Sequence, residues 1–254
     1  MNSSFEDRCT KFKSITLSKR EICDFELIVN GGFNPLSGFM NKDDYDSCVS
    51  NMRLFNNKLW SMPITLSINE KQYEELKHSD YVVLKHETGL PLGLMNIKSS
   101  NSIFKYDLEK ECENVYGGFD TNHPYVKILK ENFDNGRIYY IGGEIEDFKL
   151  PPHYDFNENR MTPKETKEYF RENGWSKIVG FQTRNPMHRS HFELTKYALR
   201  VAGKYSRLFL NPVVGITQDC DINYHTRVKC YKKLLNYYKK NDVLLGLLPL
   251  SMRM

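Results

Sequence analysis

The 254-residue sequence has no apolar run of about 18 residues, the minimum that a membrane-spanning helix needs. Its opening residues, MNSSFEDRCTKFKS, also lack the apolar segment of a secretory signal. We therefore expect a cytoplasmic protein without a membrane partner. The six cysteines are scattered and none forms a CxxC pair, which favours reduced thiols and argues against a structural zinc site.

Two catalytic motifs and a strong charge bias are also absent. The sequence contains neither the GxxxxGK(S/T) pattern of a P-loop nor the GxSxG pattern of a nucleophile elbow. The 36 Lys and Arg residues exceed the 32 Asp and Glu residues, so the formal net charge is +4. This mild excess suits an enzyme that binds anions. The sequence shows no stripe of basic and aromatic residues, and we expect no nucleic-acid partner.

Residues 1–155 are predicted to form a β-rich domain. Turn residues separate three segments that are rich in strand-forming residues, namely 59–68, 81–100 and 137–150. The second segment is typical of a hairpin that turns at residues 87–89, and the third of two strands broken at Gly142 and Gly143. Short strands at this spacing favour a small antiparallel barrel or sandwich.

A second domain is predicted over residues 156–254, after a proline-containing linker at 151–160. Thr162, Pro163 and Glu165 are typical of a helix start, as N-cap, first helical residue and capping-box partner. Gly174 is typical of the residue that ends such a helix. The second domain therefore begins with a helix of about three turns.

The rest of this domain alternates strands with helices. We predict strands at 177–182, 207–215 and 243–250 and helices at 186–202 and 225–240. This order builds right-handed βαβ units and a parallel sheet. Three strands make half of a doubly wound sheet, so we expect the domain to be incomplete. We also expect the last strand to present unpaired backbone groups at an edge and an apolar face with little cover, and the 254-residue chain to be poorly soluble or oligomeric.

The segment after the first of these strands is the candidate functional site, because ligands of a parallel sheet bind beyond the carboxyl ends of its strands. Its sequence is QTRNPMHRSH, residues 182–191. Asn185 is predicted to be the N-cap and Pro186 the first residue of the following helix. Free backbone N–H groups and the helix dipole then face the site, and such a helix start binds anions.

Polar side chains surround that helix start. The Arg184 guanidinium can form paired hydrogen bonds with sulfate or phosphate oxygens, and Gln182 and Thr183 add neutral donors. His188 and His191 are three residues apart, so we expect both on one face of the first helical turn. The two histidines could also be a surface pair or metal ligands, but no third ligand lies at the usual spacing.

The sequence QTRNPMHRSH resembles the QxRNPxHxxH signature of the ATP sulfurylase (sulfate adenylyltransferase) family, which is related to the HxGH motif of α/β nucleotidyltransferases. Four further segments resemble blocks of that family in the same order: DFELIVNGGFNPLSGFM (24–40), LWSMPITLSI (59–68), NPVVGITQDCDINYHTRVKCY (211–231) and LLPLSMRM (247–254). The resemblance implies an N-terminal PUA-like β-barrel domain followed by the first part of a Rossmann-like α/β catalytic domain.

The resemblance also implies a reaction, in which ATP and sulfate give adenosine 5′-phosphosulfate (APS) and pyrophosphate by direct attack of sulfate on the α-phosphate. Mg²⁺ would be carried by the ATP phosphates, with no ligands from the protein. By resemblance, Gln182 and Arg184 bind sulfate, and Thr183, Arg184 and Asn185 are catalytic. ATP would be bound by Gln182, Thr183, Arg184, Asn185, His188 and His191. The complete protein is implied to be a homo-oligomer.

The sequence departs from the family pattern in two places. Where the family has TKPGDID, this chain has TQDCDIN at 217–223, so Gln218 replaces a lysine and Asp219 a proline, followed by Cys220. The AGPRE and GRDHAG motifs and a fused APS kinase domain do not follow within these residues, so we expect little or no turnover from this chain alone. The alternatives are the sulfurylase part of a bifunctional PAPS synthetase and a non-catalytic fragment that binds anions or RNA.

Overall fold

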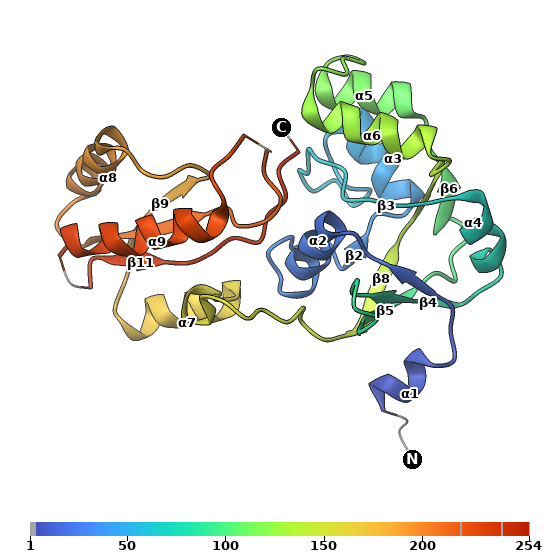
Figure 1. Cartoon of the computed structure of the whole chain (residues 1–254), viewed down its shortest axis with the longest axis horizontal. Coiled ribbons are helices and arrows are strands. Elements are labelled where there is room, and N and C mark those ends of the chain that lie inside the picture. Colours follow the sequence, from blue (N-terminus) through green and yellow to red (C-terminus); the bar gives the residue numbers. More distant parts are fainter. Residues whose placement is uncertain (1–3, 219, 240, 254) are drawn as a thin grey trace. The chain divides into compact units, whose positions relative to one another are not determined.

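The structure is a computed structural model that describes residues 4–218, 220–239 and 241–253 (Figure 1). The chain divides into two compact units. Unit 1 comprises Met1–Val29, Phe33–Pro151 and Arg253–Met254, and unit 2 comprises Asn30–Gly32 and Pro152–Met252. The main boundary therefore falls between Pro151 and Pro152.

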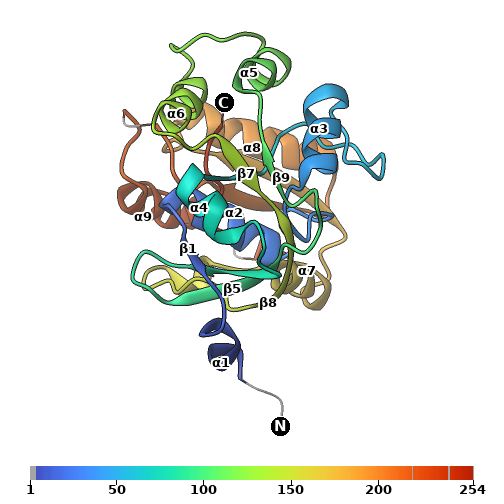
Figure 2. The same cartoon turned by 90° about the vertical axis from the view of Figure 1, so that its right-hand side faces the viewer.

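Unit 1 contains a five-stranded mixed sheet (Figure 2). In spatial order its strands are β1 (Ser14–Thr16), β4 (Tyr81–Lys85), β5 (Pro91–Asn96), β8 (Gly143–Phe148) and β2 (Gly38–Phe39). β1 pairs with β4 in parallel, and the remaining pairs are antiparallel. The hairpin predicted over 81–100 is confirmed, because β4 and β5 pair antiparallel and Gly89 in their turn has a φ of +86°.

A second sheet in unit 1 is antiparallel. Its strands, in spatial order, are β3 (Leu66–Ile68), β7 (Tyr139–Ile141) and β6 (Ile103–Lys105). Gly142 separates β7 from β8 as predicted, and a Cβ there would lie 2.0 Å from the Met40 carbonyl oxygen. The strand predicted at 59–68 was wrong before residue 66, where Pro63 cannot donate to a strand partner.

Unit 1 also contains short helices that the sequence pattern did not predict. They are α1 (Phe5–Cys9), α2 (Lys19–Val29), α3 (Lys42–Asn51), α4 (Glu70–Leu76), α5 (Leu108–Tyr116) and α6 (Pro124–Asp134). Asn41, Asn69 and Asp107 begin three of them by accepting backbone N–H bonds. Because these helices span only 5 to 11 residues, each is no longer than the shortest window of about 11–18 residues in which helical periodicity is read. The prediction of a β-rich domain therefore omitted these helices.

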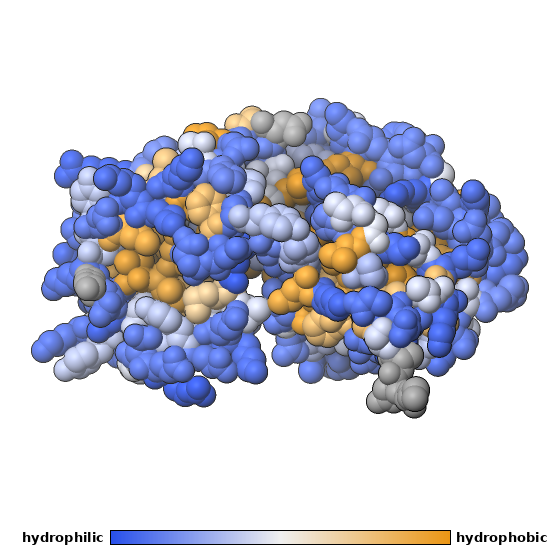
Figure 3. Space-filling model, turned by 60° about the horizontal axis from the view of Figure 1, so that its bottom comes forward, coloured by the Kyte–Doolittle hydropathy of each residue, from blue (hydrophilic) through white to orange (hydrophobic). Residues whose placement is uncertain are grey.

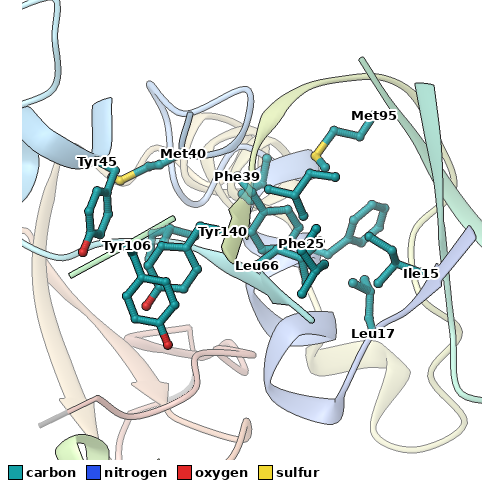
Figure 4. Close-up of a cluster of buried hydrophobic side chains, with 14 of the residues drawn as sticks. Ile15, Leu17, Phe25, Phe39, Met40, Tyr45, Leu66, Met95, Tyr106 and Tyr140 are labelled. Carbon is teal, nitrogen blue, oxygen red and sulfur yellow. The ribbon is translucent and has the colours of Figure 1, made fainter. Parts of the chain in front are cut away.

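One buried cluster of apolar side chains forms the core of unit 1 (Figure 4). Within it the Tyr106 and Tyr140 rings are stacked, with centroids 3.8 Å apart. The hydroxyls of Tyr140 and Tyr45 donate to the same oxygen of the Glu111 carboxylate, at 2.9 Å and 2.8 Å. Burial raises the pKa of Glu111 to about 7, although both hydroxyls favour its ionised form.

Unit 2 contains a parallel sheet in the order β11–β10–β9, which confirms the predicted alternation of strands and helices. Along the chain its elements are η1 (Asn157–Asn159), α7 (Pro163–Glu172), β9 (Lys177–Thr183), α8 (Arg189–Ala202), β10 (Ser206–Pro212), α9 (Tyr224–Leu234), η2 (Leu235–Tyr237) and β11 (Val243–Leu245). The predicted start of α7 is confirmed. The Glu165 N–H donates to the Thr162 hydroxyl at 3.2 Å, and the Thr162 N–H donates to the Glu165 carboxylate at 2.8 Å.

The strand predicted at 243–250 lies at one edge of this sheet, but its apolar side is covered. Leu245 and Leu247 are 2% and 4% exposed, and they pack with Val228 and Tyr231 of α9. The expectation of an uncovered apolar face there was therefore wrong. The more exposed edge strand is β9, where Ile178 is 39% exposed. Figure 3 shows apolar residues reaching the surface among hydrophilic ones.

Candidate functional site

The loops that follow the three strands of unit 2 are joined by backbone hydrogen bonds at the carboxyl edge of the sheet. The Val213 N–H donates to the Thr183 carbonyl at 2.8 Å, and the Met252 N–H donates to the Ile216 carbonyl at 2.9 Å. The predicted site segment therefore lies beside the loops that follow β10 and β11. This edge is where ligands of open parallel sheets bind.

Helix α8 begins at Arg189 rather than at Pro186, and its N-cap is His188 rather than Asn185, so the predicted helix start was wrong. The Asn185 N–H instead donates to the Thr183 hydroxyl oxygen at 3.2 Å, and that hydroxyl donates to the Asn185 carbonyl at 3.1 Å. This local turn competes with the capping role. The first helical N–H groups consequently belong to residues 189–191.

The two signature histidines lie together at the start of α8. Their ring centroids are 5.4 Å apart with an interplanar angle of 24°, and the His188 N–H donates to His191 Nδ1 at 3.1 Å. The structure therefore places both rings on one side of the helix start, as predicted, although His188 is the N-cap and only His191 lies within the helix. Within the part of the chain that the structure describes, no three His, Cys, Asp or Glu side chains are placed to hold a metal ion.

The Arg184 side chain contacts the loops that follow β10 and β11. Its Nε lies 3.9 Å from Asp221 Oδ2, and its Nη1 lies 3.2 Å from Met252 Sδ. The Arg184 side chain is 29% exposed, whereas that of Asp221 is 7% exposed. Asp221 therefore lies within ion-pair distance of the guanidinium, and its negative charge offsets part of the attraction of Arg184 for an anion.

Two buried side chains of α9 hold the backbone of the signature segment. Arg227 donates through Nη1 to the carbonyl oxygens of Arg184 and Val213, the latter at 3.0 Å. Tyr231 donates its hydroxyl to the Asn185 carbonyl at 2.6 Å. Burial raises the pKa of the Tyr231 hydroxyl above its ordinary value, so this group stays a donor well above neutral pH. Sequence reasoning missed both residues. The sequence of a lysine-rich helix does not indicate which of its basic or aromatic side chains is buried.

The remaining predicted positions lie on the same edge. Gln182 is exposed near the end of β9, where the sheet register pairs it with Asn211. In the loop that departs from the family pattern, the Gln218 N–H donates to Asp221 Oδ2 at 3.0 Å. This loop therefore holds the carboxylate that faces Arg184. Asp219 and Met254, which the sequence analysis also named, lie outside the described residues.

Comparisons with known sequences cover nearly the whole chain. Residues 2–150 match the family profile of the PUA-like domain, and residues 157–254 match that of ATP-sulfurylase. A sulfate adenylyltransferase of Debaryomyces hansenii is 43% identical over 96% of this chain and 47% of its own length. Those of Candida albicans and Saccharomyces cerevisiae are 43% and 40% identical, over 95% and 94% of this chain and 46% and 45% of their own. The chain spans about half the length of the curated relatives it matches.

A solved structure described as a hexameric APS kinase from Thiobacillus denitrificans has a similar fold. It superposes with a TM-score of 0.76 at 23% sequence identity. The matched region covers 97% of this chain and 43% of the chain of that structure. At this identity the likeness concerns the fold alone. The sequence matches, in contrast, cover both the β-rich unit 1 and the signature segment QTRNPMHRSH. The chain belongs to the ATP-sulfurylase family, with a PUA-like domain over residues 2–150 followed by the ATP-sulfurylase region over residues 157–254.

Proposed function

We propose that this chain carries a sulfate adenylyltransferase site, which converts ATP and sulfate into APS and pyrophosphate. The observation that carries the proposal is the turn at residues 183–185, which α9 holds so that Arg184 stands before the start of α8. An arginine beside a helix N-terminus provides two sources of positive potential at one edge of a sheet. Such an edge suits a reaction between two anions.

The proposed reaction requires no proton transfer by the protein. Sulfate is already ionised, so a sulfate oxygen attacks the α-phosphorus without a general base. The new P–O bond forms as the bond to the bridging oxygen of the β-phosphate breaks, and pyrophosphate leaves with that electron pair. The protein must align two anions that repel each other and stabilise charge on the α-phosphoryl group.

The six signature residues keep the roles that the family resemblance implies. Sulfate is bound by Gln182 and Arg184. The α-phosphate and the leaving group are acted on by Thr183, Arg184 and Asn185. All six residues contact ATP. Two of them, His188 and His191, lie beside the free N–H groups at the start of α8. Mg²⁺ enters with ATP as part of the substrate.

The activity of the whole protein, its assembly and its location belong to the same proposal. We infer a homo-oligomer, which the hexameric assembly named for the structural neighbour supports. We also infer a cytoplasmic location, which the buried thiols of Cys9, Cys48 and Cys112 support. Among the helices of the described ranges, none combines the length and the apolar character needed to cross a membrane.

Binding of APS tests the proposal without requiring turnover. We expect Arg184→Ala to weaken APS binding by about 30-fold or more, because truncating one partner of a hydrogen-bonded charge pair costs about 2–5 kcal/mol. Arg184→Lys should recover little, since an ammonium cannot make the paired contacts of a guanidinium. Calorimetric titration of the 254-residue chain with APS measures both variants.

Arg171→Ala is the matched control, because Arg171 is exposed in the last turn of α7. Its APS affinity should equal that of the unsubstituted chain. APS binding that Arg184→Ala leaves unchanged, in a protein with an unchanged circular dichroism spectrum, would overturn the assignment. Sulfate-dependent release of pyrophosphate from MgATP then measures how much turnover the chain supports.

A further inference from the structure

A groove with a volume of about 670 Å³ lies in unit 2, away from the proposed active site. It is lined by the end of α8 and by the segment between η2 and β11. Ser206 and Asp242, which line it, stand at the amino ends of β10 and β11. Arg184, in contrast, follows the carboxyl end of β9. The groove and the signature segment therefore occupy opposite ends of the parallel sheet.

Four cationic side chains line the groove. Lys196 and Arg200 are one turn apart on α8, Lys204 follows the end of that helix, and Lys239 contributes from the segment after η2. At 1.5 Å per helical residue, Lys196 and Arg200 lie about 6 Å apart along α8, and Lys204 extends the row beyond the end of the helix. This row matches a ligand whose negative charges are spread along a line better than a single small anion.

Little negative charge compensates these cations. Among the described lining residues Asp242 is the one acid, and its Oδ1 lies 3.4 Å from Arg207 Nε. Glu193 lies 3.9 Å from Lys196 Nζ, and both side chains are about half exposed. An exposed contact of that length contributes little to holding either charge. The groove therefore keeps a positive potential.

Aromatic rings adjoin the cations. Tyr237 lines the groove with 70% of its surface exposed. Its neighbour Tyr238 is fixed, because its hydroxyl lies 2.7 Å from the Thr195 hydroxyl and its ring packs against Phe192 at 5.0 Å. An exposed ring beside a fixed one, next to a row of cations, is the arrangement on which nucleic-acid bases stack.

We propose that this groove binds single-stranded nucleic acid, with phosphates along Lys196, Arg200, Lys204 and Lys239 and a base stacked on Tyr237. Sequence reasoning argued against such a partner because no continuous stripe of basic and aromatic residues was evident. The fold assembles the stripe from two segments, 196–206 and 237–242. This binding site is independent of the proposed adenylyl transfer.

Fluorescence anisotropy of a labelled oligouridylate of about ten nucleotides, titrated with the 254-residue chain, tests the proposal. Each phosphate contact contributes about −0.7 to the slope of log affinity against log salt, so four contacts give a slope of about −2.8. Substituting Lys196→Gln, Arg200→Gln and Lys204→Gln together should flatten this slope by about 2. Tyr237→Ala should weaken binding by about 5-fold to 150-fold, whereas Tyr237→Phe should retain it.

The matched control substitutes Lys11→Gln, Lys71→Gln and Lys110→Gln, which are exposed in unit 1 and remove the same charge. We expect this control to keep the salt slope, and the groove variants to keep their affinity for APS. The proposal is overturned if the unsubstituted chain does not bind the oligonucleotide at low salt, or if the control loses as much affinity as the groove variant. It is also overturned if inorganic tripolyphosphate displaces the probe as well as unlabelled oligouridylate does.

Discussion

Single buried residues determine how firmly the signature segment is held. Arg227 and Tyr231 donate to the main-chain oxygens of consecutive residues, Arg184 and Asn185. A loop carbonyl that is withdrawn from water needs such a donor, and an unmet one costs about 1–3 kcal/mol. Arg227 and Tyr231 are therefore positioning residues, since they act on the ligand through the backbone that carries Arg184.

Tyr231→Phe removes the hydrogen bond to Asn185 and keeps the ring that packs in the unit 2 core. We expect APS affinity to fall by about 3-fold to 10-fold, because a hydrogen bond of this kind contributes about 0.5–1.5 kcal/mol. Tyr238→Phe is the control, because it removes a hydroxyl contact to Thr195 away from the site. Both variants should lower the midpoint of thermal unfolding, but only Tyr231→Phe should change APS affinity. Equal changes in affinity would show that the Tyr231 hydroxyl has no positioning role.

Glu111 makes the stability of unit 1 depend on pH. Its carboxylate is 1% exposed, and burial raises its pKa from about 4.5 to about 7. Between these two values the folded state binds more protons than the unfolded state. The contribution of Glu111 to stability is therefore fully present below about pH 4.5 and is lost as the pH rises to about 7.

Glu111→Gln should remove that loss, because glutamine does not titrate and its amide oxygen can still accept from the two tyrosine hydroxyls. As the pH rises from about 5 to about 8, the free energy of unfolding of the original chain should decrease. This decrease should be roughly 3 kcal/mol larger than that of the Glu111→Gln variant. Urea unfolding followed by Trp60 fluorescence, with Trp175→Phe in both proteins, measures unit 1 alone. Glu113→Gln on the exposed side of α5 is the control, and a pH profile identical to that of Glu111→Gln would contradict the assignment.

At the scale of secondary-structure elements, α7 is set by its first residues. Thr162 and Glu165 satisfy each other's backbone N–H groups, and Pro163 needs no partner at the first helical position. Thr162→Ala should therefore lower the free energy of unfolding of unit 2 by about 1 kcal/mol. Trp175 follows the helix and stacks on Phe170 at 5.5 Å, so its fluorescence in urea, with Trp60→Phe present, reports this loss. Lys164→Ala, two residues further on, should leave the midpoint within the error of the measurement.

The contrast between α7 and α8 explains which elements the sequence could predict. The start of α7 depends on residues that are adjacent in sequence, so the pattern at 162–165 was sufficient. Asn185 has an equally good capping side chain, but its N–H and carbonyl are taken by Thr183 and by Tyr231, which lies 46 residues away. No local pattern reveals that competition. The same limit hid the short helices of unit 1, whose ends are set by single caps and whose faces are set by tertiary packing.

At the scale of the whole molecule, an ion pair joins two residues that lie far apart in the sequence. The Arg253 guanidinium forms an ion pair with the Asp24 carboxylate of α2, 229 positions away in the sequence, and both belong to unit 1. Their side chains are 5% and 2% exposed, and the Arg253 guanidinium lies 5.5 Å from the Tyr125 ring. Burial raises the pKa of Asp24, and the positive charge of Arg253 opposes that rise. Since sequence patterns carry no information about so distant a pair, the sequence analysis did not predict it.

Arg253→Met should therefore destabilise unit 1 although it changes a residue at the far end of the chain. Removing one partner of a buried ion pair leaves an uncompensated charge and costs about 3–5 kcal/mol near neutral pH. Without Arg253, the folded-state pKa of Asp24 rises further above its unfolded value. As the pH falls, the Asp24 carboxylate therefore takes up a proton, and the stability lost by Arg253→Met becomes smaller. Adding Asp24→Asn should restore part of the loss, since it removes the unpaired charge.

Urea unfolding followed by Trp60 fluorescence, with Trp175→Phe in every protein, measures these free energies. Arg8→Met is the control, because Arg8 pairs with Asp147 at 3.0 Å while both side chains remain about one-third exposed. A surface pair of that kind contributes about 1 kcal/mol or less, so this variant should change stability by no more than that. If Arg253→Met costs no more than Arg8→Met, or if Asp24→Asn adds to the loss instead of relieving it, the ion pair does not hold the end of the chain to α2.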